Sequence, residues 1–194
     1  MENKTIRSFF AIPVSAACRQ EINNCVIELK KDLPPVFRWV DIDNIHITLK
    51  FLGEFNSNDI DPIKNKLETV LSTANQFSLT FQNLGVFPYE RKPKVVWIGI
   101  TFPSQLKLLF EEVEKAALAL GYPREERGFS PHITLGRVKN DVNNQDLFQI
   151  GRVIQNRKVG EICKSQVKGI TFFQSKLSPA GPVYSELFFL GLKQ

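Results

Sequence analysis

The tetrapeptide His-Ile-Thr-Leu occurs twice in the chain, at residues 46–49 and 132–135, and it contains the only two histidines in the sequence. In an extended strand, successive side chains point to opposite faces of the sheet. Each copy would therefore bury its isoleucine and leucine on one face and present its histidine and threonine on the other. Two strands that each present a His-x-Thr pair predict the two halves of one site.

Secondary-structure signals follow the same order before and after residue 90. Alternating or continuous apolar runs predict strands at 5–12, 37–40, 45–52, 77–87, 95–100, 132–138, 165–177 and 183–190. Gly53 is expected to close the third of these strands. Apolar residues at helical spacing predict helices from Ser15 to Lys31 and at about 58–74, 104–120 and 144–156.

The spacing of these signals indicates an internal duplication. The two histidines are 86 residues apart, and the first expected strands of the two halves begin at a similar spacing. We therefore expect an α+β fold with two pseudo-symmetric β-α-β-α-β lobes, whose mainly antiparallel sheets face a central cleft. The chain would form a single bilobal domain over residues 1–194, with lobes at roughly 5–90 and 94–190 that are free to intertwine.

Composition excludes several classes of protein. The chain is 43% hydrophobic and 23% charged, as in ordinary globular proteins. It has no apolar stretch of the roughly 20 residues that span a bilayer, and its polar start does not fit a signal peptide. We expect a cytoplasmic protein without a membrane partner. The net charge of +5 is a mild bias towards anionic partners.

The three cysteines, Cys18, Cys25 and Cys163, are odd in number and show no Cys-x-x-Cys spacing. This pattern favours buried apolar thiols in a reducing compartment over a disulfide framework or a zinc site.

The duplicated motif suits acid–base chemistry at a phosphate. Two facing imidazoles, His46 and His132, can serve as one general acid and one general base, because their ordinary pKa of about 6.5 allows either protonation state. The hydroxyls of Thr48 and Thr134 can donate hydrogen bonds to anionic oxygens between the rings. This set of groups fits an in-line displacement at phosphorus.

Two cations lie close to the motifs in the sequence. Lys50 shares the face of the first histidine in a regular strand, and Arg137 follows the second motif. Arg137 can add a fixed positive charge to the phosphate site. In a regular strand, however, it would point away from His132, so its contribution requires a bulge or strand end near Gly136.

Several segments together resemble one family. RSFFAI, RWV…NIHITLKFLGE, PKVVWIGI, FSPHITLGRVK and SKLSPAGPVYSEL, which extend from Arg7 to Leu187, are similar to sequences of the two-histidine phosphoesterase superfamily. Within that superfamily they resemble the bacterial and archaeal RNA 2′,3′-cyclic phosphodiesterases, also called 2′-5′ RNA ligases. Both motifs are present without substitution.

The resemblance implies a function and a role for each site residue. The implied reaction is hydrolysis of a terminal 2′,3′-cyclic phosphate on RNA to a 2′-phosphomonoester without a metal or other cofactor, together with reversible 2′-5′ ligation. It implies that His46 protonates the leaving 3′ oxygen and that His132 activates water. Thr48, Thr134 and Arg137 would hold the phosphate.

Other functions remain compatible with the residues themselves. They are a phosphodiesterase for another cyclic nucleotide or a 2′,5′-linked oligonucleotide, an RNA-binding module without turnover, and a metalloenzyme, which would need a third ligand near the histidines. The oligomeric state is expected to be a monomer.

Further residues could contact RNA. Phe9, Trp39 and Tyr184 are each candidates either to stack a base or to pack in the core. The basic loop 91–94 and the cluster Arg152, Arg157 and Lys158 are candidates either to follow an RNA backbone or to be solvated surface.

Overall fold

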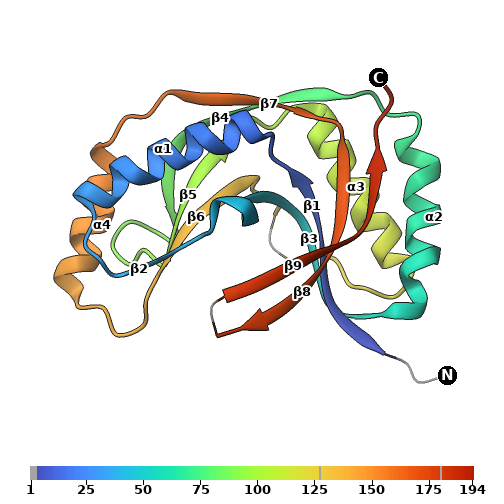
Figure 1. Cartoon of the computed structure of the whole chain (residues 1–194), viewed down its shortest axis with the longest axis horizontal. Coiled ribbons are helices and arrows are strands. Elements are labelled where there is room, and N and C mark those ends of the chain that lie inside the picture. Colours follow the sequence, from blue (N-terminus) through green and yellow to red (C-terminus); the bar gives the residue numbers. More distant parts are fainter. Residues whose placement is uncertain (1–3, 127, 180) are drawn as a thin grey trace.

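Two antiparallel sheets form the framework of the computed structural model, which describes residues 4–126, 128–179 and 181–194 (Figure 1). The first sheet has the strand order β3 (His46–Asn56), β1 (Thr5–Pro13), β8 (Gly169–Ser178) and β9 (Gly181–Gly191). The second sheet has the order β2 (Phe37–Trp39), β6 (His132–Val138), β5 (Val95–Ile100), β4 (Phe77–Phe87) and β7 (Glu161–Val167). The expected α+β class with two antiparallel sheets facing a central cleft is confirmed.

In the described ranges, four α-helices cover the two sheets, and each sheet is covered by one helix from each half of the sequence. Helices α2 (Ile60–Leu71) and α3 (Ser104–Leu118) pack together beside the first sheet, where α3 contacts β3 and α2 contacts β9. Helices α1 (Ala16–Asp32) and α4 (Asn144–Asn156) cover the second sheet through β7 and β4 (Figure 1). Helix α1 follows β1 of the first sheet but packs on the second sheet, and α3 follows β5 of the second sheet but packs on the first. None of the helices in the described ranges is long and apolar enough to cross a bilayer.

Strands are exchanged between the halves as well. Strand β4 pairs with β5 and β7 in the second sheet, whereas β8 pairs with β1 in the first. The segments 5–90 and 94–190 therefore do not each form one sheet. The single strand expected over 165–177 is wrong, because the chain leaves the second sheet at Val167 and enters the first at Gly169. The sequence stays strand-like throughout this stretch, so local periodicity does not reveal the change of sheet.

The internal duplication is visible in the strand register. Ala11 pairs with Thr48 and Pro13 with His46 in the first sheet. Trp97 pairs with Thr134 and Gly99 with His132 in the second sheet, and each of these four residues lies 86 positions later in the sequence than its counterpart in the first. Both motif strands also contain a register shift directly after the threonine, which leaves the motif leucine without a paired residue. The two motifs therefore occupy equivalent positions.

Strand β3 continues beyond Gly53, contrary to the expectation that this glycine ends it. Gly53 adopts a φ of 66°, in the left-handed region that glycine tolerates, next to a second register shift in β3. The strand then pairs with β1 as far as Asn56, opposite Thr5. The glycine permits an irregularity within the strand and does not terminate it.

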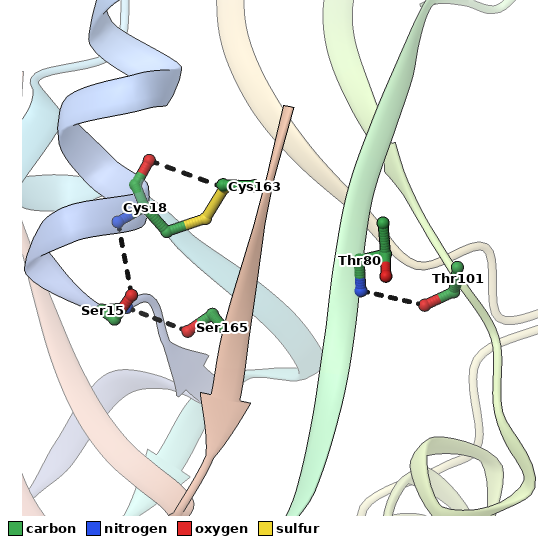
Figure 2. Close-up of a disulfide and its surroundings, with 6 residues drawn as sticks. All are labelled: Ser15, Cys18, Thr80, Thr101, Cys163 and Ser165. Carbon is green, nitrogen blue, oxygen red and sulfur yellow. Dashed lines mark hydrogen bonds between the residues drawn. A yellow bond between two sulfur atoms is a disulfide. The ribbon is translucent and has the colours of Figure 1, made fainter. Parts of the chain in front are cut away.

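A disulfide joins α1 to β7, so the prediction of unpaired thiols is wrong for Cys18 and Cys163 (Figure 2). Their Cα atoms lie 5.6 Å apart although 145 residues separate them in the sequence. Ser15 caps α1 by accepting the Cys18 N–H at 3.3 Å, and its own N–H donates to Ser165 Oγ at 3.1 Å. The pairing was not predictable from spacing because it depends on α1 crossing to the second sheet. Cys25 remains a free thiol.

Candidate active site

The motif strands present their residues as strand alternation predicts. Their aliphatic side chains are buried in the core, namely Ile47, Leu49, Ile133 and Leu135. The histidines and threonines lie on the opposite face of each strand and are partly accessible. Core burial therefore fixes which face of β3 and β6 carries the polar pair.

Each imidazole forms the same kind of hydrogen bond, to the backbone carbonyl two residues before it. His46 Nδ1 lies 2.7 Å from the Asn44 carbonyl oxygen, and His132 Nδ1 lies 2.8 Å from the Ser130 carbonyl oxygen. A carbonyl oxygen only accepts, so Nδ1 carries the hydrogen in each ring. The neutral ring then has an unprotonated Nε2, which can accept a proton, whereas the charged ring can donate one from the same atom.

Aromatic side chains surround both rings. Phe9 stacks on His46 with ring centroids 4.8 Å apart, and Tyr184 lies edge-on to it at 5.4 Å. Phe87 lies edge-on to His132 at 4.9 Å. Burial lowers the pKa of both imidazoles below the ordinary value, while the backbone hydrogen bond opposes the shift. The neutral form of each ring is therefore favoured in the free protein.

Arg137 lies on the histidine face because of the register shift in β6. Val96 pairs with Gly136 and Trp97 with Thr134, so Leu135 is bulged and alternation is reversed beyond it. The charge of Arg137 accordingly contributes to lowering the pKa of His132, after the larger effect of burial. The same charge partly offsets the burial that raises the pKa of Tyr184 on β9. Arg137 thus lies between the two sheets.

Lys50 does not lie on that face, so its expected position beside His46 is wrong. The equivalent shift at Leu49 turns Lys50 away, and the residue is only 2% exposed. Lys50 Nζ donates to Glu114 Oε1 on α3 and to the Pro123 carbonyl oxygen, both at 2.8 Å. Lys50 therefore ties β3 to α3. Phe51 occupies the position equivalent to Arg137 and is 52% exposed.

Neither motif threonine has a hydroxyl hydrogen bond to the described part of the protein. Thr48 and Thr134 are partly accessible on the histidine face, each two residues after its histidine. A hydroxyl donor in this position is available to an acceptor that enters the cleft.

The three aromatic candidates have different positions. Phe9 is buried but contacts His46 directly. Tyr184 is half-buried, lies edge-on to His46, and is near the charges of Arg137 and Arg7, which act on its pKa. Trp39 stacks on Phe37 at 4.8 Å with Lys30 Nζ 5.7 Å from its ring, so it packs beneath α1 and not in the cleft.

The cations outside the motifs also separate into groups. Arg157 forms an ion pair with Asp32 and belongs to the outer surface near α1.

Sequence reasoning gave no role to Arg7 and Arg38. Arg7 acts electrostatically on Tyr184, and Arg38 lies directly opposite Arg137 in the β2–β6 pair. The strand pairing identifies Arg38, and the electrostatic effect on Tyr184 identifies Arg7. In the described ranges, no group of three or more His, Cys, Asp or Glu side chains is arranged to hold a metal ion.

The fold is that of a class of phosphoesterases, and comparison with known proteins identifies the family. A family model described as LigT like Phosphoesterase matches residues 12–97 and 100–184. The chain belongs to this family and is an enzyme.

Relatives named RNA 2′,3′-cyclic phosphodiesterase resemble it along nearly the whole chain. An RNA 2′,3′-cyclic phosphodiesterase of Methanothermobacter thermautotrophicus is 30% identical over 182 residues, covering 94% of this chain and 96% of the relative. One from Archaeoglobus fulgidus is 33% identical over 184 residues, with coverage of 94% and 98%. The crystal structure of E. coli LigT complexed with 3′-AMP superposes with a TM-score of 0.78 at 27% identity, covering 98% of this chain and all of that one.

Proposed function

We propose that this enzyme hydrolyses the terminal 2′,3′-cyclic phosphate of RNA to a 2′-phosphomonoester. The observation that carries the proposal is the matched orientation of the two imidazoles, each with Nδ1–H bound to a backbone carbonyl and Nε2 left for the substrate. The activity of the similar RNA 2′,3′-cyclic phosphodiesterases supports the choice of substrate.

The two histidines have different electrostatic surroundings, which supports different roles. Arg137 favours neutral His132, as a general base that activates water requires. Among the described residues, no cation contributes to the pKa shift of His46. A bound phosphate would raise the pKa of both imidazoles by opposite-charge attraction, and Arg137 opposes that rise at His132. His46 is then the acid that protonates the leaving 3′ oxygen.

The phosphate is held by the groups beside the rings. The hydroxyls of Thr48 and Thr134 donate to its non-bridging oxygens, and Arg137 supplies a bidentate positive group. Stabilising charge on these oxygens lowers the barrier of in-line attack. The protonated and neutral imidazoles perform both proton transfers, so the reaction proceeds without a metal.

The same groups also act when a 5′-hydroxyl replaces water as the nucleophile: it attacks the bound 2′,3′-cyclic phosphate, His132 takes its proton and His46 protonates the departing 3′ oxygen, which gives a 2′-5′ linkage. Re-formation of the cyclic phosphate from that linkage is the reverse step. We propose that the enzyme acts as a monomer, because both motifs belong to one chain, and that it works in the cytoplasm.

The decisive experiment offers the protein an RNA that ends in a 2′,3′-cyclic phosphate, with EDTA present, and identifies the product isomer. The expected product is a 2′-phosphate, and a 3′-phosphate as main product would mean that the ribose binds in the opposite orientation. Loss of activity in EDTA would contradict the metal-free mechanism. His46→Ala and His132→Ala should each lower turnover by about 10²–10⁴-fold, because each removes one proton transfer. A folded single variant with normal turnover would contradict the paired roles.

A further inference from the structure

An arginine on the short strand β2 lies beside the proposed phosphate site. Arg38 pairs directly with Arg137 of β6, and both side chains are exposed. Directly opposite residues of an antiparallel pair point to the same face, with Cβ atoms about 4.5–5.5 Å apart. Arg38 therefore extends the histidine face of the second sheet by one strand.

The arginine pair is electrostatically unfavourable without an anion. Like charges directly opposite one another destabilise a sheet. Within the described ranges, no carboxylate lies at ion-pair distance from Arg38 or Arg137. A bound phosphate would relieve this repulsion, and arginine binds phosphate through its planar fork.

A basic loop continues from the same end of the sheet. Strand β5 flanks Arg137 on its other side through Val95, which also pairs with Phe87 of β4. The loop 88–94 joins these two strands, and Val138 N–H donates to the Lys94 carbonyl oxygen at 2.9 Å. Its cationic side chains are exposed, namely Arg91, Lys92 and Lys94, beside the single acidic residue Glu90.

We infer that Arg38 binds the phosphodiester that joins the terminal nucleotide to the preceding one, and that the loop 88–94 contacts phosphates further along the RNA. The inference rests on the proposed function, in which Arg137 holds the reacting phosphate. Contacts to backbone phosphates position a nucleic acid without reading its sequence. The enzyme would therefore prefer an oligonucleotide end of any sequence over a nucleoside 2′,3′-cyclic phosphate.

Two substrates test this inference, namely adenosine 2′,3′-cyclic phosphate without a 5′ phosphate and a tetranucleotide that ends in the same group. Arg38→Gln should lower kcat/KM for the tetranucleotide by about tenfold, as expected for one charge-assisted contact, and leave the nucleoside value unchanged. In Arg38→Gln, the slope of log kcat/KM against log salt concentration should become less steep by about 0.7 for the tetranucleotide. This is the contribution of one phosphate contact to the slope on a single strand. Arg38→Lys should recover part of the loss.

Lys66→Gln on the exposed side of α2 serves as the matched control, and it should change neither substrate. An equal loss on both substrates would place Arg38 at the reacting phosphate and overturn the inference, as would no loss on either. Hydrolysis of neither substrate by the unmodified enzyme would instead reject the proposed function, and the inference with it.

Discussion

Arg137 and His132 lie on the same face of β6, where burial and then the arginine charge lower the pKa of the imidazole. The relationship exists because the bulge at Leu135 reverses the alternation between the two residues. The arginine charge therefore favours the neutral form of His132, the form that the proposed role of general base requires.

The first prediction concerns pH. The proposed mechanism requires neutral His132 and charged His46, so kcat/KM should follow a bell-shaped profile. Its maximum should lie below pH ~6.5, because the pKa values of both imidazoles are lowered in the free enzyme. Arg137→Gln removes a nearby cation, which raises the pKa of His132 and should move the acidic limb to higher pH. The pH dependence of kcat/KM, measured with a nucleoside 2′,3′-cyclic phosphate as substrate, gives this shift. Arg152→Gln on α4 should leave the limb in place, and an unmoved limb in Arg137→Gln would contradict the coupling.

The second prediction concerns the threonine hydroxyls. Thr48→Val and Thr134→Val keep the shape of the side chain but remove the donor, so each should lower kcat by about 10²-fold without loss of fold. Thr171→Val is the matched control, because its hydroxyl is fully buried and has no described partner. That variant should retain activity and be at least as stable. Normal kcat in both motif variants would exclude the hydroxyls from phosphate binding.

The third prediction concerns the buried ion pair. Lys50→Met leaves the Glu114 carboxylate buried without its cation and should lower the free energy of unfolding by about 3–5 kcal/mol. The double variant Lys50→Met/Glu114→Leu removes both charges and should recover most of that loss. Chemical denaturation measures both effects. If the double variant is as unstable as the single one, packing and not charge accounts for the role of Lys50.

The fourth prediction concerns the disulfide. Its 145-residue separation means that it restricts a long loop of the unfolded chain, so reduction should lower stability by about 2–4 kcal/mol. Thermal unfolding with and without dithiothreitol gives the difference. Cys25→Ala should retain the effect of the reductant and Cys18→Ala should abolish it. An unfolding temperature that does not respond to reductant would show that the bond makes no contribution to stability.

The sequence alone determined the local structure of the motif strands. Alternation in His-Ile-Thr-Leu predicted that the aliphatic pair is buried and that histidine and threonine share the other face, because strand geometry has a period of two. Helical spacing likewise predicted all four helices near their observed bounds. The 86-residue spacing predicted two equivalent strands, which the matching registers confirm.

Only the tertiary structure decided what lies beyond each motif. A bulge reverses the alternation of the residues that follow it, up to the next irregularity of the strand. Its position depends on hydrogen bonds to a neighbouring strand that lies far away in the sequence. For this reason Lys50 turned into the core and Arg137 turned towards His132, against the pattern of a regular strand. Long-range pairing likewise placed Cys18 against Cys163 and Arg38 opposite Arg137, since the exchange of strands and helices between lobes leaves no local signal.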